Sequence, residues 1–273
     1  MVLGVELSRV DAPRGVLVEV LRVYVVIALV TLLVSHTPGS FMIMYGHLLL
    51  AAAFLGLALT MARRDPRGAV YYGIDLAGLL EASPDEPLHY GHGLWFALRR
   101  ALPSLLRELG VALLVALLVF PPFVLAFQLW HQPQHPFTWH LPAQPVDFAL
   151  TQLVAIATPE EALFRGYFQT RLSDLSAPAG QLSSPTHKTS RFDLFTRTRR
   201  LLGADVSLAA LTSQAALFAL LHFLVGFSPA RLAVFFPGLL FGWLRARRGG
   251  IGAASWFHAL CNLLADVLTR GYL

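Results

Sequence analysis

TPEEALFRG, residues 158–166, is the stretch that decides how this chain folds and where its chemistry lies. It places three charges, those of Glu160, Glu161 and Arg165, between apolar segments of a chain that is 56% hydrophobic and only 14% charged. A carboxylate in hydrocarbon is costly unless it is paired or protonated. Two adjacent glutamates here therefore indicate a functional centre, and the plainer alternative is a solvated helix end just past a membrane span.

The spacing within this stretch gives the two glutamates different roles. Pro159 suits the first turn of a helix, and acidic residues in that turn are favoured by the helix dipole. Glu161 and Arg165 are four residues apart, so they share a helix face and are expected to pair. Glu160 is rotated from that face by roughly 100° and stays available. Two like residues can thus supply one structural ion pair and one base.

Composition places the whole chain in a membrane. A soluble domain carries about 25% charged residues, well above the value of this 273-residue chain. We expect an all-α fold, a polytopic membrane helical bundle with about seven to eight transmembrane helices. The seven apolar spans are predicted at residues 23–35, 40–62, 109–130, 146–172, 206–227, 229–244 and 251–268. An eighth would come from part of residues 68–103.

The arginines between these spans fall on alternate links, which predicts a cytoplasmic N-terminus. The net charge of +5 therefore indicates cytoplasmic loops beside a lipid bilayer and no nucleic-acid partner. We expect one integral membrane domain, multi-pass, in a bacterial inner (cell) membrane. Residues 1–145 hold N-terminal spans and an interfacial amphipathic helix near Trp95, Arg99 and Arg100. Residues 146–273 form the catalytic core, with a polar loop at 173–204.

Three further polar residues stand inside predicted spans: His222, His258 and Asn262. A lone histidine in a span is usually structural, but ionisable residues on three spans usually face a common cavity or each other. Their types fit peptide hydrolysis, because Glu160 with His222 can polarise a water while His258 and Asn262 donate to the oxyanion. Asp266 lies near the same face, although a span end explains it equally well.

Three motifs carry a resemblance to a known family: Glu160-Glu161-x-x-x-Arg165, Phe218-x-x-x-His222 and His258-x-x-x-Asn262. In this order they resemble the CAAX protease and bacteriocin-processing (CPBP) family of glutamic intramembrane proteases, and in part its myxosortase-type subgroup. The resemblance implies that Glu160 and His222 activate water and that His258 and Asn262 form the oxyanion hole. It also implies that Glu161 and Arg165 support the site. It implies a membrane-associated protein or peptide substrate, with no metal and no cofactor.

Two alternatives remain open from the residues alone. Glu160, His222 and His258 could be zinc ligands of a membrane metalloprotease. The buried charges could instead belong to a transporter, an immunity protein or a scaffold without enzymatic activity.

The depth of the two histidines is a difficulty for every version of a common site. His222 lies about 24 Å into its predicted span and His258 only about 10 Å into its own. They meet only if the spans are offset, tilted or begin later than hydropathy indicates, and the face to which the site opens is left undecided.

Overall fold

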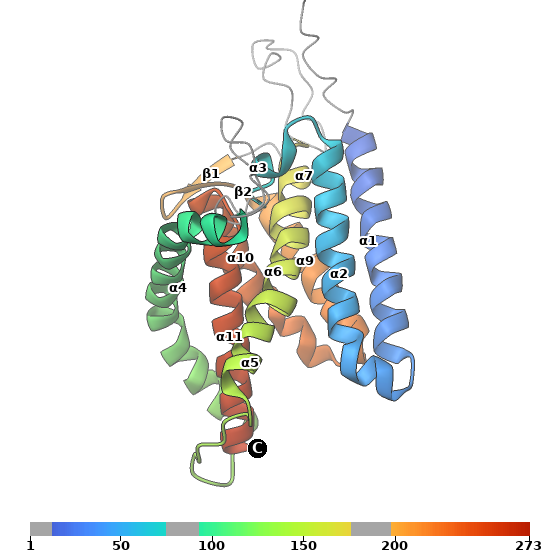
Figure 1. The fold of residues 1–273 in the computed structure, drawn as a ribbon. Helices are drawn as coiled ribbons and strands as arrows, with labels where there is room; N and C mark the ends of the chain where they lie inside the picture. The colour runs from blue at the N-terminus through green and yellow to red at the C-terminus, as the bar shows by residue number, and fades with distance from the viewer. Residues whose placement is uncertain (1–12, 75–92, 176–197) are drawn as a thin grey trace, which may run out of the picture.

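The computed structural model describes residues 13–74, 93–175 and 198–273, and these residues form an all-α helical bundle (Figure 1). Seven helical passes run between the two ends of the bundle in this part of the chain. The predicted fold class is therefore confirmed, while an eighth crossing within residues 75–92 would lie outside the described residues.

The first passes are α1 (Pro13–His36) and α2 (Ser40–Arg64), followed by the short α3 (Gly68–Tyr71). The next pass, α4 (Gly93–His131), contains Pro103, Pro121 and Pro122. Its first turns lie across the end of the bundle before the helix turns along it (Figure 1). Trp95, Arg99 and Arg100 are exposed on these turns, so the interfacial amphipathic helix remains a reasonable prediction for them.

The fourth pass carries the two glutamates and is continuous from Pro145 to Ser173. Its parts are α5 (Pro145–Leu150), η1 (Thr151–Ala157), α6 (Thr158–Glu161), η2 (Ala162–Phe168) and α7 (Gln169–Ser173). The last passes are α9 (Leu208–Gly226), the 3₁₀ turn η3 (Pro229–Val234) leading into α10 (Phe235–Arg248), and α11 (Gly252–Tyr272).

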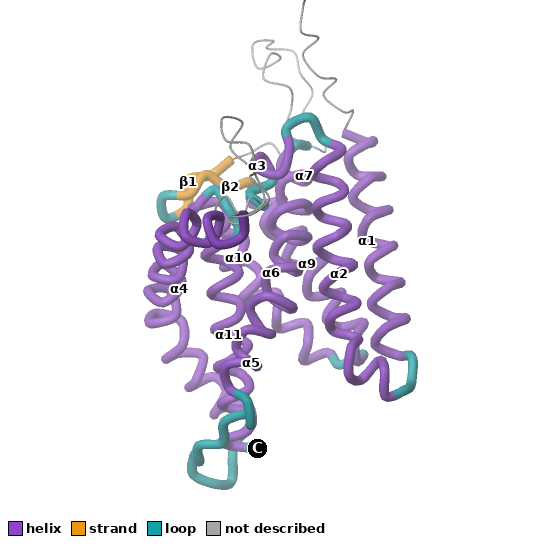
Figure 2. Tube along the Cα trace, viewed as in Figure 1, coloured by secondary structure: helices purple, strands orange, loops and turns teal. Residues whose placement is uncertain are grey.

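One antiparallel hairpin, β1 (Thr198–Leu201) with β2 (Ala204–Ser207), interrupts the helices (Figure 2). The prediction of a loop over residues 173–204 is therefore wrong for its last residues, and most of it lies outside the described residues. Leu202 and Gly203 turn the chain with positive φ angles of 47° and 79°, as a two-residue turn requires. Val206 belongs to β2, so the fifth pass starts at Leu208, where the Ser207 hydroxyl accepts from the Ala210 N–H at 3.3 Å.

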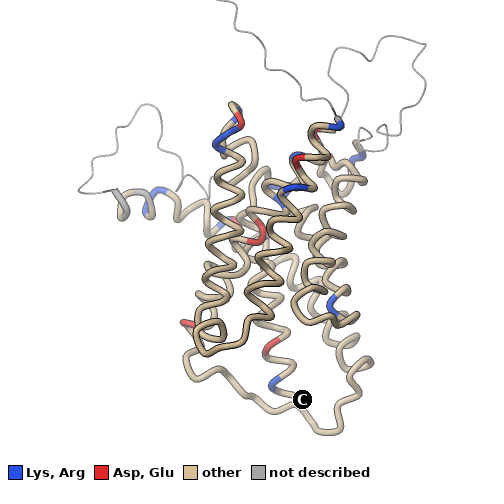
Figure 3. Tube along the Cα trace, turned by 90° about the vertical axis from the view of Figure 1, so that its right-hand side faces the viewer, with Lys and Arg blue, Asp and Glu red and all other residues tan. Residues whose placement is uncertain are grey.

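Four helices are long and apolar enough to cross a membrane: Arg14–His36, Ser40–Arg64, Leu98–His131 and Leu208–Gly226. Of the remaining passes, one carries the glutamates and α10 has only 14 residues. The third, α11, has 21 residues, but polar residues such as His258, Asn262 and Asp266 interrupt its apolar sequence. Charged residues gather at one end of the bundle (Figure 3). We call this the arginine-rich end; among others it holds Arg63, Arg64, Arg67, Arg99, Arg100, Arg199, Arg200, Arg245, Arg247 and Arg248. At the opposite end, where the C-terminus lies, the described arginines are Arg231 and Arg270.

An ion-pair network ties the helix ends together at the arginine-rich end. Arg67 donates to Asp65 at 2.6 Å and to Asp174 at 2.7 Å, and the Tyr72 hydroxyl donates to Asp65 at 2.7 Å. Burial alone would raise the pKa of the Asp65 carboxyl, but the hydrogen bonds from Arg67 and Tyr72 outweigh it and hold the pKa well below its usual range. The network thereby joins the end of α2 to the end of α7.

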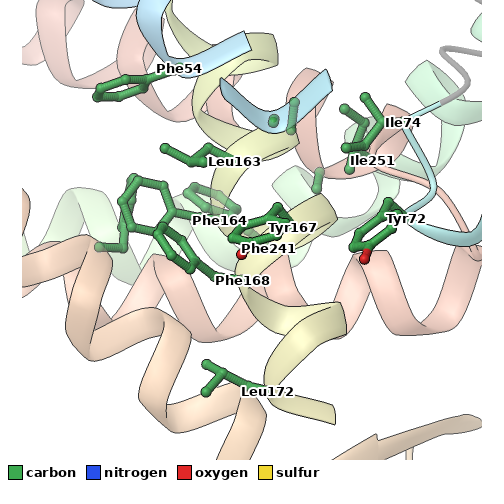
Figure 4. Close-up of a cluster of buried hydrophobic side chains, with 14 of the residues drawn as sticks. Phe54, Tyr72, Ile74, Leu163, Phe164, Tyr167, Phe168, Leu172, Phe241 and Ile251 are labelled. Atoms are coloured by element: carbon green, nitrogen blue, oxygen red, sulfur yellow. The ribbon is translucent and has the colours of Figure 1, made fainter. Parts of the chain in front are cut away.

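The core lies between this network and the glutamates. It is aromatic, with Phe164, Tyr167 and Phe168 of η2 packed among side chains from other helices (Figure 4). Phe164 and Phe218 meet edge to face at 5.1 Å between ring centroids, and all of these rings are fully buried. Packing of this kind holds η2, and so the adjacent glutamates, in a fixed position.

Candidate active site

Glu160 and Glu161 occupy the single α-helical turn between two π-helical segments. The Thr158 N–H bonds to the Leu153 carbonyl, five residues back, as in a π-helix. Because Pro159 has no N–H, the widened turn before it accommodates a proline inside a continuous helix. The prediction that the glutamates stand at a helix start is therefore wrong: Ala157 is already helical, so no free helix N-terminus faces them.

Glu161 and Arg165 form the predicted ion pair. Arg165 Nη1 donates to Glu161 Oε1 at 2.9 Å, and neither side chain has any exposed surface. Arg165 Nη2 also donates to the Gly238 carbonyl at 3.3 Å. The guanidinium lies 4.2 Å from the centroid of the Phe218 ring, where a cation–π contact stabilises it.

α10 approaches this pair closely because Gly238 and Gly242 lie on its contact face. A Cβ at Gly238 would stand 3.1 Å from Arg165 Nη2, and one at Gly242 would stand 2.6 Å from Gln214 Nε2. The carbonyls of these glycines accept from buried side chains, that of Gly242 from Gln169 Nε2 at 2.9 Å. The close approach thus supplies acceptors for otherwise unsatisfied buried donors.

His258 bridges the two glutamates. Its Nδ1 lies 2.8 Å from Glu161 Oε1 and its Nε2 lies 3.8 Å from Glu160 Oε2. Since Glu161 also pairs with Arg165 it is ionised, so Nδ1 of His258 is the donor. The imidazole stacks on the Phe241 ring at 4.7 Å with an interplanar angle of 15°. This contact fixes the direction in which Nε2 points.

His222 reaches the same carboxylate from α9. Its Nε2 lies 3.8 Å from Glu160 Oε2, and its Nδ1 lies 3.0 Å from the Phe218 carbonyl. A carbonyl only accepts, so Nδ1 carries the proton and Nε2 is left facing Glu160. Phe218 and His222, four residues apart in the sequence, therefore interact directly.

Glu160 is the more exposed of the two glutamates, since the Glu161 side chain is fully buried. Its side chain is 16% exposed and that of His222 is 24% exposed. Glu160 Oε2 has no hydrogen-bond partner within the described residues. The distance of 3.8 Å to each imidazole is too long for a direct hydrogen bond and suits a bridging water.

Asn262 is held by a residue that the sequence did not single out. Its Nδ2 donates to Gln152 Oε1 of η1 at 3.0 Å, one turn of α11 beyond His258. Gln152 lies in a predicted span, and its being a polar residue there was the one signal that could have identified it. Asp266 pairs instead with Arg270 at 2.7 Å, so it does not hold any of the predicted site side chains.

The two histidines meet despite their different depths. His222 is 14 residues from the start of α9 at Leu208, and His258 is six residues from the start of α11 at Gly252. Both imidazoles are 3.8 Å from one oxygen of Glu160. The helix starts are therefore offset along the bundle or the helices are inclined, as the sequence required for a common site.

Residues 142–264 match a family model described as Type II CAAX prenyl endopeptidase Rce1-like. Over this segment the chain is similar to the CPBP family, as its three motifs predicted, and the match supports a membrane peptidase of the CAAX type. The match does not distinguish the myxosortase-type subgroup, which stays a prediction. Neither a curated protein nor a solved structure matches the chain.

Proposed function

We propose that this protein is a glutamic endopeptidase that hydrolyses a peptide bond of membrane-associated proteins. The observation that carries the proposal is the approach of Nε2 atoms from two separate helices to one oxygen of Glu160, at 3.8 Å each. A carboxylate between two imidazoles in a mostly buried site can take a proton from water.

The proposed reaction uses the residues in the following order. Glu160 accepts a proton from water, with His222 Nε2 orienting that water, and the hydroxide attacks the carbonyl carbon of the substrate. Asn262 Nδ2 and His258 Nε2 donate to the resulting oxyanion. The C–N bond then breaks as the proton held by Glu160 moves to the leaving nitrogen, which restores the carboxylate.

The contacts of His258 impose a condition on its role. Its Nδ1 proton is already donated to Glu161 at 2.8 Å, so Nε2 can donate to the oxyanion only when the ring carries both protons. His258 therefore acts as an imidazolium at that step. The buried Glu161 carboxylate, shared with Arg165, holds the ring in the orientation that this donation needs.

A metalloprotease would bring the same three side chains slightly closer together. Ligand atoms of a tetrahedral zinc site stand roughly 3.3 Å apart, given bond lengths of about 2.0 Å, and Glu160 Oε2 lies 3.8 Å from Nε2 of each imidazole. No group of three or more His, Cys, Asp or Glu side chains in the described part of the chain is arranged to hold a metal ion. Activity that is lost with chelator and restored by zinc alone would favour the metal mechanism.

The test is Glu160→Gln, which keeps the shape of the side chain and removes the base. Cleavage should fall by about 10²–10⁴-fold, with expression and membrane insertion unchanged. Asp147→Asn is the matched control, because Asp147 is an exposed carboxylate in α5 and its loss should leave cleavage intact. Cleavage by Glu160→Gln at the wild-type rate would disprove the proposal.

A further inference from the structure

The first half of α4 carries large apolar side chains that no other part of the protein covers. They recur at intervals of three or four residues and so form one stripe along the helix: Trp95, Leu98, Leu102 and Leu106. Their exposed fractions are 75%, 40%, 51% and 56%. The stripe begins on the turns that lie across the arginine-rich end (Figure 1), so it belongs to the outer surface at that end.

A basic face borders this apolar stripe. At 100° per residue, Arg99 lies about 40° from Trp95 around the helix, and Arg107 lies about 80° beyond Arg99. Both arginines are exposed. Ala101 is 1% exposed and lies on the other side of the stripe. Around its circumference the helix therefore presents a protein-facing side, an exposed apolar side and a basic side, which is the pattern of a helix that lies in a membrane interface.

The apolar stripe cannot turn inward, because the opposite side of α4 is fixed to the bundle. Ala101 and Ala112 are eleven residues apart, which places them on one face, and they are 1% and 0% exposed. Glu108 accepts from Arg248 at 2.5 Å, at the end of α10. A Cβ at Gly252 would stand 3.0 Å from Glu108 Cγ, so α4 also packs closely on the start of α11. The stripe thus needs a partner from outside the chain.

The arginines at this end exceed the acidic side chains that could neutralise them. Asp65 and Asp174 accept from Arg67, and Glu108 is taken by Arg248. Asp205 is exposed, but it stands opposite Arg200 in the hairpin. In the described part of the chain, five exposed arginines at this end form no ion pair: Arg63, Arg64, Arg99, Arg107 and Arg199. This surplus of positive charge favours an anionic partner.

We propose that residues 95–107 of α4 bind anionic phospholipid, with the apolar stripe against the acyl chains and Arg99 and Arg107 at the phosphate groups. A soluble anion would contact the arginines and leave the stripe in water, whereas a phospholipid leaflet supplies both kinds of contact. By the positive-inside rule this end faces the cytoplasm, where the leaflet carries anionic lipid. The inference does not rest on the proposed function, because none of these residues belongs to the proposed active site.

Fluorescence quenching at the stripe tests both the contact with lipid and its preference for negative charge. Cys261 is the one cysteine of the chain, so Leu98→Cys in a Cys261→Ala background can be labelled selectively with bimane. The full chain is reconstituted in vesicles of phosphatidylcholine and phosphatidylglycerol, in which one or the other lipid carries brominated chains. Bromine quenches only at short range. Both brominated lipids should therefore quench the label, and phosphatidylglycerol should do so more strongly at equal content.

Arginine variants of the labelled protein decide whether this surface causes the preference. Arg99→Gln and Arg107→Gln should each lower the relative affinity for phosphatidylglycerol by about fivefold, the contribution of one arginine near an anionic surface. Arg231→Gln is the matched control, since Arg231 is exposed at the opposite end and its loss should leave the preference unchanged. No quenching by either lipid, equal quenching by both, a preference that persists without Arg99 and Arg107, or an equal loss in Arg231→Gln would each overturn the proposal.

Discussion

Replacing Arg165 with methionine isolates the contribution of the buried ion pair. The guanidinium is fully buried, and it donates to Glu161 at 2.9 Å and to the Gly238 carbonyl at 3.3 Å. Methionine has a similar length but neither charge nor donors. Arg165→Met therefore leaves Glu161 buried, ionised and in contact with His258 alone.

The expected cost follows from that uncompensated charge. Removing one partner of a buried pair destabilises a protein by about 3–5 kcal/mol. For a chain of this size each kcal/mol lowers the melting temperature by about 2–4 °C, so the expected drop is about 6–20 °C. Adding Glu161→Gln should recover more than half of the loss, because glutamine removes the orphaned charge and still accepts from His258.

Thermal unfolding of the purified variants in detergent, followed by helical circular dichroism, measures these differences. Arg248→Met is the matched control, since its pair with Glu108 is partly exposed, with 27% and 12% of the two side chains accessible. That pair should contribute no more than about 1 kcal/mol. Two results would contradict this expectation: a wild-type melting temperature for Arg165→Met, or a double variant that is less stable than Arg165→Met alone.

Three further outcomes are expected. Gln152→Met should lower kcat and leave KM near its wild-type value, because the Asn262 amide loses its acceptor. Gln152→Glu keeps an acceptor oxygen and should restore kcat. Equal kcat values for the wild type and both variants would refute this. Gly242→Ala should destabilise the protein by about 1–3 kcal/mol, because the added methyl group overpacks the contact. Gly110→Ala, where open space surrounds the glycine, should not, and thermal unfolding measures both variants. Asp65→Asn should lower the melting temperature at neutral pH. Because the folded pKa of Asp65 is depressed, its contribution is present above the ordinary carboxyl range and disappears as pH falls through the folded value. A deficit that instead grows on acidification would contradict that sign.

Much of the site could be predicted from the sequence because spacing on a helix fixes which residues share a face. The Glu161–Arg165 pair followed from an interval of four residues, and it is present at 2.9 Å. The same rule placed His222 on the face of Phe218. It did not predict the π-helical segments around Glu160, because a widened turn depends on how the neighbouring helices pack against Pro159.

Gln152 shows a different gap in sequence reasoning. It is separated from Asn262 by 110 residues, and no local pattern relates two polar residues on different helices. The hairpin at Thr198–Ser207 was missed for a related reason. Its turn uses Leu202 and Gly203 without the Asn-Gly signal, and its strands are held by Trp243, whose indole donates to the Leu201 carbonyl at 3.0 Å.

The sequence by itself determined the membrane class, the all-α fold and the residues that carry charge inside the apolar helices. These are properties of composition and of intervals along one helix, and they need no knowledge of neighbours. Only the tertiary structure decided that one oxygen of Glu160 lies 3.8 Å from Nε2 of each of the two imidazoles. This arrangement depends on the offset and inclination of separate helices, which are set by side-chain packing between segments far apart in the chain.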